Sequence, residues 1–229
     1  MPIRALIFDF DGLILDTETP EYQSWQEIYA EFGCDLPIKT WGQIVGGNGA
    51  SRFDPLDFLE TQVGRNLDRT ELITRHRARD TEIIAASPIL PGVVEILTDA
   101  RQMGLQLAIA SSSPHSWVDA HLTRLGLFDR FEAIICVDDV GVAKPDPSLF
   151  LRAAEALGVA RDEAIIFEDS PNGVLAAKRA GIFCVAVPNP TTRLLAFESP
   201  DMRLNSLAEM SLGALLKWVC FISVEALIE

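Results

Sequence analysis

The chain has 229 residues, with 19 Lys and Arg against 33 Asp and Glu, which gives a formal net charge of −14. Hydrophobic residues make up 48% and charged residues 23%, proportions that are typical of a soluble globular protein and argue against disorder. The negative charge disfavours binding to nucleic acid or to an anionic membrane, so we expect neither partner. An anionic small molecule would need a local cation, from a metal ion or a placed Lys.

Residues 3–8, IRALIF, are apolar apart from Arg4 and are followed at once by Asp9, Asp11 and Gly12. Successive side chains of an extended backbone alternate between faces, so this spacing predicts that Asp9 and Asp11 project to the same side. Two carboxylates in one small space indicate metal binding or acid/base chemistry. The alternative is a strand end that is merely capped by turn-forming Asp and Gly.

The next stretch lacks clear strands, and we expect residues 17–87 to form an all-helical cap. The apolar spacing of Trp25, Ile28, Tyr29 and Phe32 predicts a helix over residues 20–32. Further helices are expected in DPLDFLETQV and ELITRHRARDTEII, with the Gly-rich piece GGNGAS as a loop. Residues 1–16 and 88–229 are then the core domain.

From residue 91 onward, helices alternate with short apolar runs at residues 105–110, 133–137, 164–167 and 183–188. With the first run, these five buried strands predict an α/β fold with a doubly wound parallel sheet. The last apolar stretch, residues 212–228, is interrupted by Lys217 and Glu225, so it is too short to span a membrane. We expect a closing helix or strand there, with a partner surface as the alternative.

The strand ends carry the polar residues. Ser111 follows the second strand, Lys144 lies in the loop after the third, and Glu168 and Asp169 end the fourth. Singly, each has a simpler explanation: Ser111 or the two acids could cap helices, and Lys144 could be a solvated loop charge. Parallel strands deliver their carboxyl ends to one edge of a sheet, where ligands bind, so the four positions together predict a site.

The segments DFDG, ASS, KPDP and FEDSPNG resemble, in this order, the four motifs of the haloacid dehalogenase superfamily. The resemblance covers residues 3–190 and implies a Rossmann-like core, a helical cap and Mg²⁺-dependent phosphoryl transfer through an aspartyl phosphate. It implies that Asp9 is the nucleophile and a metal ligand, and that Asp11 is the general acid and base and also a ligand, through its backbone carbonyl.

The same resemblance assigns the remaining positions. Glu168 and Asp169 would complete the metal sphere, while Ser111 and Lys144 would hold the transferring phosphoryl group. Other expected substrate and phosphate contacts are Gly12, Ser112, Asn172 and, in the cap, Arg52.

Asp11 favours phosphate chemistry over carbon–halogen cleavage, because dehalogenases of the superfamily lack an acid at that position. The cap also resembles that of the β-phosphoglucomutase-like branch, in which a His commonly occupies the position of Glu21 and a cap Lys partners it. Here RHRARD offers Arg75, His76, Arg77 and Arg79 but no Lys. We therefore expect hydrolysis of a small phosphomonoester, such as a sugar or other metabolite phosphate, and keep a sugar-phosphate mutase as the alternative. A non-catalytic phosphoacceptor or binding module is a remote third possibility.

The four cysteines form no CxxC pair and lie mostly in apolar runs, so we expect buried thiols of a reducing compartment. The amino terminus lacks the pattern of a secretory signal, and we expect a cytoplasmic protein. A monomer and a homodimer are both compatible with the sequence.

Overall fold

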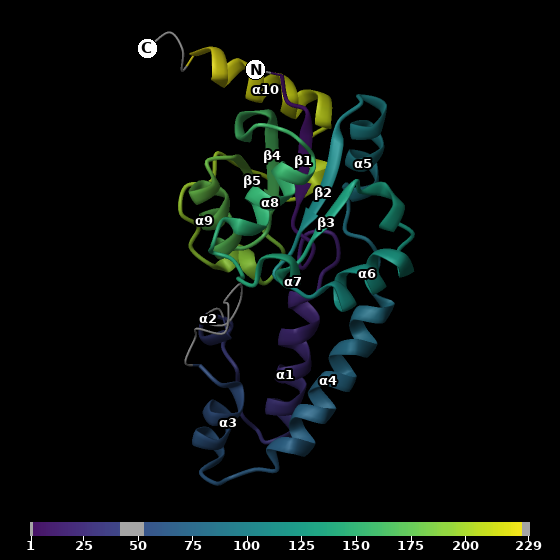
Figure 1. The fold of residues 1–229 in the computed structure, drawn as a ribbon. Helices are drawn as coiled ribbons and strands as arrows, with labels where there is room; N and C mark the ends of the chain where they lie inside the picture. Colours follow the sequence, from purple (N-terminus) through teal and green to yellow (C-terminus); the bar gives the residue numbers. More distant parts are fainter. Residues whose placement is uncertain (1, 42–52, 226–229) are drawn as a thin grey trace.

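In the computed structural model, which describes residues 2–41 and 53–225 and the side chains to residue 221, six parallel strands form one sheet (Figure 1). The strand order is β3-β2-β1-β4-β5-β6. The strands are β1 (Ala5–Phe8), β2 (Gln106–Ala110), β3 (Ala133–Ile135), β4 (Ala164–Glu168), β5 (Phe183–Ala186) and β6 (Met202–Arg203). The predicted α/β class with a parallel, doubly wound sheet is confirmed.

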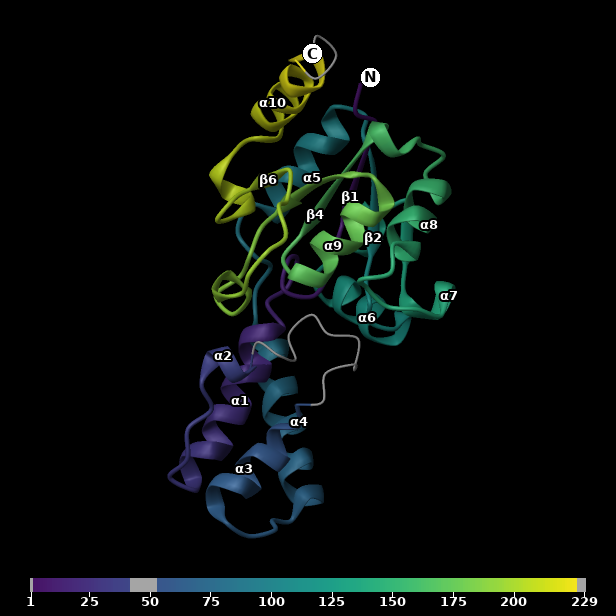
Figure 2. The same ribbon diagram turned by 90° about the vertical axis from the view of Figure 1, so that its left-hand side faces the viewer.

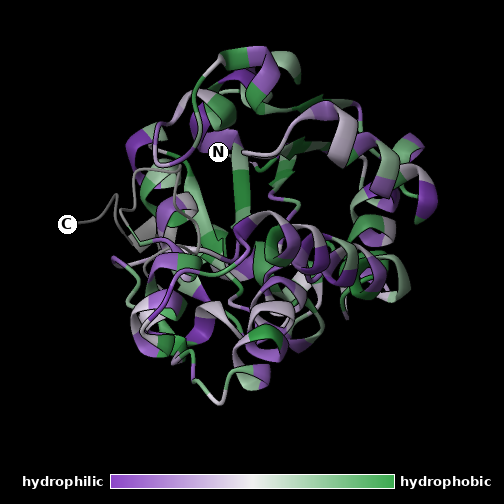
Figure 3. Ribbon diagram, turned by 90° about the horizontal axis from the view of Figure 1, so that it is seen from below, coloured by the Kyte–Doolittle hydropathy of each residue, from purple (hydrophilic) through white to green (hydrophobic). Residues whose placement is uncertain are grey.

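Both faces of the sheet are covered, which explains why its strands are continuous apolar runs. On one face, Leu6 and Phe8 of β1 pack in a core with helices α5 (Val93–Gln102), α6 (His115–Arg124) and α10 (Leu212–Glu225). On the other, Ala5 and Ile7 pack with α8 (Ser148–Ala156) and α9 (Pro171–Ala180). The strands accordingly stand out as hydrophobic in Figure 3.

The segment between β1 and α5 is helical and has an apolar core of its own. It contains α1 (Glu18–Glu31), α2 (Ile38–Trp41), α3 (Pro55–Val63) and α4 (Arg69–Ala86). Trp25, Ile28 and Tyr29 are buried in this core, and Phe32 packs against it, as the helical spacing predicts. The unit lies beyond one end of the sheet, opposite α10 (Figure 2). The expected loop GGNGAS lies outside the described residues.

The two chain segments that connect this helical unit to the sheet lie side by side. Leu15 and Ile89 form an antiparallel bridge, and the amide of Leu90 donates to the carbonyl of Ile14 at 3.0 Å. We call these segments the paired linkers. The domain boundaries at residues 17 and 87 stay a prediction.

Some elements differ from the prediction. The run predicted as a strand over residues 133–137 ends at Ile135, and the short helix α7 (Val137–Val140) follows. Neither the edge strand β6 nor α2 was expected from the sequence. Single 3-10 turns occupy Phe128–Arg130, Arg161–Glu163, Thr192–Leu194 and Leu207–Glu209.

The cysteine and tail predictions are partly corrected. All four cysteines are free thiols; Cys136 and Cys184 are buried, but Cys34 is only half-buried and Cys220 is exposed on α10. Cys220 is exposed because only one side of α10, with Leu212, Leu215 and Val219, packs into the core. The tail is a helix, and none of the helices in the described part of the chain is long and apolar enough to cross a membrane.

Candidate active site

The carboxyl ends of the strands converge on one cavity of about 650 Å³ between the sheet and the helical unit. Asp9 and Asp11 reach it from β1, and Ser112 and Ser113 from β2. Its floor is completed by three residues: Lys144 from the segment between α7 and α8, and Glu168 and Asp169 from β4. The structure thus brings together the residues that the sequence places at separate strand ends.

Asp9 lies at the floor of the cavity and is only 5% exposed. Lys144, equally buried, donates hydrogen bonds from Nζ to Asp9 and, at 2.7 Å, to Oε1 of Glu168. Burial raises the pKa of Asp9 to about 8, because it outweighs the opposing effect of Lys144. Burial lowers the pKa of Lys144, but Asp9 and Glu168 outweigh it and raise the value above its ordinary range. Lys144 is therefore a fixed positive charge beside the Asp9 carboxylate.

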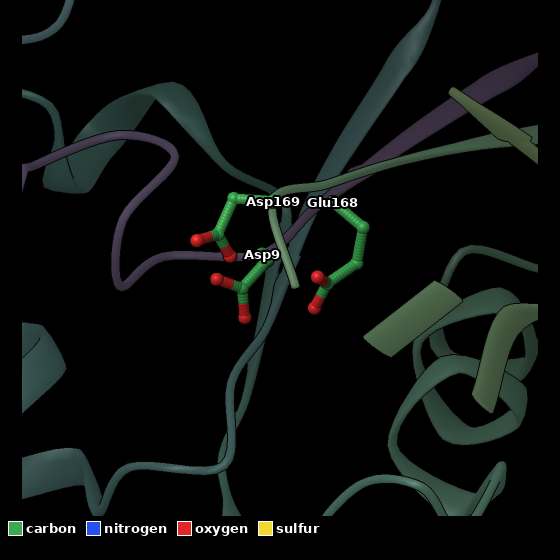
Figure 4. A group of neighbouring side chains, drawn as sticks. All are labelled: Asp9, Glu168 and Asp169. Atoms are coloured by element: carbon green, nitrogen blue, oxygen red, sulfur yellow. The ribbon is translucent and has the colours of Figure 1, made fainter. Parts of the chain in front are cut away.

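Asp9, Glu168 and Asp169 form a buried acidic cluster (Figure 4). One carboxylate oxygen from each lies within 4.8 Å of those of the other two. The pKa of Asp169 is well above its ordinary value, first because of burial and then because of Glu168 and Asp9. If all three buried carboxylates are ionised, Lys144 alone leaves an excess of negative charge, which a bound cation would compensate. Oxygen ligands and uncompensated charge of this kind fit Mg²⁺.

The carboxylate of Asp11 does not join this cluster but turns toward β2 and α6. It accepts hydrogen bonds from Ser113 Oγ at 2.7 Å, from Trp117 Nε1 at 2.8 Å and from Ser111 Oγ at 3.2 Å. Ser111 is fully buried, and its Oγ also accepts from the amide of Ser113 at 3.0 Å. In this structure Ser111 therefore holds Asp11, whereas Ser112 and Ser113 line the cavity.

Two glycines allow backbone to approach the acids closely. Gly12 has φ +78°, and a Cβ there would lie 2.9 Å from Cγ of Asp169. The amide of Gly12 donates to the carbonyl of Leu15 at 2.7 Å, and the phosphate contact expected at Gly12 stays a prediction. A Cβ on Gly173, in the first turn of α9, would lie under 3.0 Å from the carboxyl atoms of Glu168. Asn172 lies in the same turn and is not among the described residues that line the cavity.

The helical unit adds an acidic wall to the cavity, formed by Glu18, Glu21 and Asp80. Burial, followed by the charge of Asp80, raises the pKa of Glu21 to about 7. Burial raises the pKa of Asp80 to about 6, and burial with Glu21 raises that of Glu18 well above its ordinary value. Lys144 is the sole basic side chain among the described residues lining the cavity.

The basic residues of RHRARD do not reach this wall. Arg75 pairs with Glu31, and Arg79 pairs with Glu27 at 2.8 Å on the exposed side of the unit. His76 is buried with its ring 4.2 Å from that of Trp25, and burial lowers its pKa to about 4. Arg77 is exposed, and Arg52 lies outside the described residues.

Several site residues were not expected from the sequence. Asn189 follows β5 and donates from Nδ2 to Oδ2 of Asp169 at 2.7 Å. The rule that strand ends carry the site would have found it, since β5 was predicted. Trp117, Glu18 and Asp80 lie within helices, where nothing in the sequence distinguishes a cavity-lining side chain from a packed one.

Comparisons with known proteins agree with this geometry. Residues 3–181 match the sequence model of the haloacid dehalogenase-like hydrolases. "Putative phosphatase YhcW" of Bacillus subtilis is 50% identical over 93% of this chain and 96% of its own. Hexitol phosphatase B of Escherichia coli is 31% identical over 93% and 97%. The crystal structure of CbbY from Rhodobacter sphaeroides in complex with phosphate matches with a TM-score of 0.69, at 26% identity, over 93% of this chain and 99% of that one.

Proposed function

The chain belongs to the haloacid dehalogenase-like hydrolase family, and on this basis we propose that it is a Mg²⁺-dependent phosphatase acting on a small phosphomonoester. Both phosphatases named above align with it over nearly their whole length. The observation that carries the proposal is the position of Asp9: a carboxylate on the floor of a cavity, in contact with Lys144 and beside Asp11.

Asp9 is the nucleophile in this proposal. Its carboxylate attacks phosphorus, the bond to the leaving oxygen breaks, and the phosphoryl group stays on Asp9 until water removes it. Covalent catalysis of this kind divides one difficult displacement into two easier steps. Lys144 supplies positive charge where negative charge grows on the phosphoryl oxygens. Its contact with both Asp9 and Glu168 fixes it there before substrate binds.

Asp11 is the proton carrier in the proposed reaction. It protonates the leaving oxygen in the first step and takes a proton from the attacking water in the second, a role that contributes about 10²–10⁴ in rate. The hydrogen bonds from Ser111, Ser113 and Trp117 separate its carboxylate from the acidic cluster and orient it. This arrangement gives the two aspartates different tasks although they lie two residues apart.

Asp9, Asp169 and Glu168 would hold Mg²⁺, together with the backbone carbonyl of Asp11 that the family resemblance implies. The bound cation supplies charge neutralisation for the buried carboxylates and for the phosphoryl group. Asn189 and the close approach at Gly12 keep Asp169 in place.

Residues 17–87 act as the cap that covers the cavity and selects the leaving group. The acidic wall of Glu18, Glu21 and Asp80 offers hydrogen-bond acceptors and disfavours a second anionic group. A polyhydroxylated leaving group satisfies such acceptors without bringing negative charge. We therefore propose a sugar or polyol monophosphate as substrate.

The test is turnover of p-nitrophenyl phosphate, followed by a screen of sugar and polyol monophosphates. Activity should require Mg²⁺, stop on addition of EDTA and be absent in Asp9→Asn. Asp129→Asn, an exposed change in a 3-10 turn of the core, is the matched control and should keep full activity. Activity that persists in EDTA, or in folded Asp9→Asn, would contradict the mechanism.

A sugar-phosphate mutase is the competing activity. It is disfavoured here because the cap presents acids at Glu21 and Asp80, and none of the cap residues lining the cavity in the described structure is a His or a Lys. Incubation with β-glucose 1-phosphate and a bisphosphate primer separates the two: release of inorganic phosphate supports the phosphatase, whereas glucose 6-phosphate would establish the mutase.

A further inference from the structure

A second, smaller cavity adjoins the candidate active site behind Gly12 and Asn189. Its volume is about 240 Å³, and it is formed by the segments around β5, β6 and the paired linkers. We call it the Asn189 pocket. It shares no lining residue with the Asp9 cavity among the described residues.

Two arginines, Arg193 and Arg203, line the Asn189 pocket. Arg193 donates from Nε to the carbonyl of Pro190 at 3.4 Å, and Arg203 donates from Nη2 to the carbonyl of Arg193 at 3.5 Å. The guanidinium of Arg203 also lies 5.0 Å from the ring centroid of Phe197. Both arginines are exposed, and the hydrogen bond of Arg203 to the backbone of Arg193 places the two residues side by side in the wall of the pocket.

Neither guanidinium is within ion-pair distance of a carboxylate among the side chains described in residues 2–41 and 53–221. This is notable in a chain with 33 acidic and 19 basic residues, where carboxylates are abundant. Guanidinium groups bind carboxylates and phosphates through two parallel hydrogen bonds. Two neighbouring arginines that line one cavity, and that have no carboxylate partner among the described side chains, offer a place for an external anion.

The rest of the wall favours a carboxylate with an apolar body. Most of it is apolar, from Leu13, Leu90, Val187, Leu207 and three prolines. Asn205 and Ser206 add polar groups to the wall. The volume corresponds to about eight water molecules of liquid, which limits the ligand to a small molecule.

Hydrogen bonds of Asn189 connect the pocket to the acidic cluster. Nδ2 of Asn189 donates to Asp169 at 2.7 Å and to the carbonyl of Gly12 at 3.4 Å. Its Oδ1 accepts from the amides of Thr191 and Thr192, both at 2.9 Å, and Arg193 is the next residue. An anion bound to Arg193 would therefore also restrict the motion of the turn at residues 189–192, whose Asn189 is hydrogen-bonded to Asp169.

We propose that the Asn189 pocket is a regulatory site for a small organic carboxylate, which binds Arg193 and Arg203 and raises turnover by fixing Asn189 against Asp169. The binding part of the proposal is independent of the phosphatase activity, whereas the effect on turnover rests on it.

The test is direct binding of benzoate, succinate and 2-oxoglutarate to the full chain, by calorimetry, with orthovanadate present to occupy the Asp9 cavity. At least one probe should bind with a Kd below about 10 mM. Arg193→Gln and Arg203→Gln, made separately, should each weaken that binding about tenfold or more, the effect of losing a charge-assisted pair. Arg101→Gln, at the end of α5, is the matched control and should bind as the wild type does.

The kinetic arm uses the same probe with p-nitrophenyl phosphate. Binding at the Asn189 pocket should raise kcat, and the rise should disappear in both arginine variants. Absence of binding by all three probes would overturn the proposal, and so would binding that survives both substitutions or that orthovanadate abolishes. A probe that binds as expected but leaves kcat unchanged would overturn the regulatory role. If the chain hydrolyses no phosphomonoester, the binding arm still decides whether the pocket takes a carboxylate.

Discussion

Replacing Gly173 by Ala should damage the candidate active site although alanine favours helices. Gly173 lies in the first turn of α9, and an added Cβ would lie under 3.0 Å from the carboxyl atoms of Glu168. That Cβ meets the functional end of a buried side chain, so the Glu168 carboxylate has to move. The carboxylate accepts hydrogen bonds from Lys144 Nζ at 2.7 Å, from the amide of Ser170 at 2.7 Å and from Ser170 Oγ at 3.0 Å.

The magnitude follows from these contacts. Hydrogen bonds to charged groups contribute about 1.5–3 kcal/mol each, and displacing Glu168 weakens three that share one carboxylate and are not additive. Alanine in a helix offsets about 0.5–1 kcal/mol of the loss. We expect Gly173→Ala to lower the free energy of unfolding by about 2–4 kcal/mol. Turnover should fall by about tenfold or more, because Lys144 loses the partner that positions it beside Asp9.

Urea unfolding followed by circular dichroism measures the first effect, and hydrolysis of p-nitrophenyl phosphate measures the second. Gly213→Ala is the matched control, because Gly213 is also helical and its added Cβ would lie at an ordinary 3.6 Å from Cε of Met103. The control should keep its activity and gain about 0.5–1 kcal/mol. If Gly173→Ala proved as stable and as active as Gly213→Ala, the close packing of α9 against Glu168 would not be what holds this carboxylate beside Lys144.

Three further predictions concern the acids and the cap. Trp117→Phe removes the hydrogen bond to Asp11 and should lower kcat about tenfold with little change in KM, measured by steady-state kinetics; an unchanged kcat would show that Trp117 does not position the proton carrier. Burial and Asp80 raise the pKa of Glu21 from 4.5 to about 7, so the stability that this group contributes is complete below about pH 4.5 and is lost as pH rises through about 7. Glu21→Gln should therefore be more stable than the wild type by about 1–2 kcal/mol at about pH 8, after allowance for partial solvent screening, and not at about pH 4.5. Urea unfolding at both pH values measures this, and a difference independent of pH would contradict it. Arg69→Gln breaks half-exposed ion pairs within the cap and should cost less than about 1 kcal/mol in thermal unfolding; a larger loss would mean that the pairs act as a network.

The sheet and its strand ends could be predicted because they depend on local patterns. A strand that is buried on both faces must be apolar along its length, so β1, β2, β4 and β5 are visible as short apolar runs. The edge strand β6 has two residues, Met202 and Arg203, and is defined by pairing with β5 and not by its composition. No periodicity can be detected in two residues, so β6 could not be predicted.

The candidate site, too, has features that could be predicted from the sequence and features that could not. Asp9, Lys144 and Asp169 follow from the order of motifs along parallel strands. The different environments of Asp9 and Asp11 could not be predicted, because they depend on Trp117, which lies 106 residues from Asp11 in the sequence. In the sequence, Glu21 is distinguished only because the β-phosphoglucomutase-like branch commonly has a His at that position. Nothing in the sequence distinguishes Asp80. Their proximity results from the packing of α1 on α4, which the sequence does not specify residue by residue.

The paired linkers have a consequence for how such a protein can change. The helical unit leaves and rejoins the sheet at one point, where Leu90 is hydrogen-bonded to Ile14 and Ile89 lies beside Leu15. Because the two linkers are adjacent, a segment of almost any length can be inserted between them without changing the path of the backbone before or after the insertion. The helical unit, which the proposed function makes responsible for substrate choice, can therefore be exchanged or lengthened as one piece while the residues at the strand ends keep their positions.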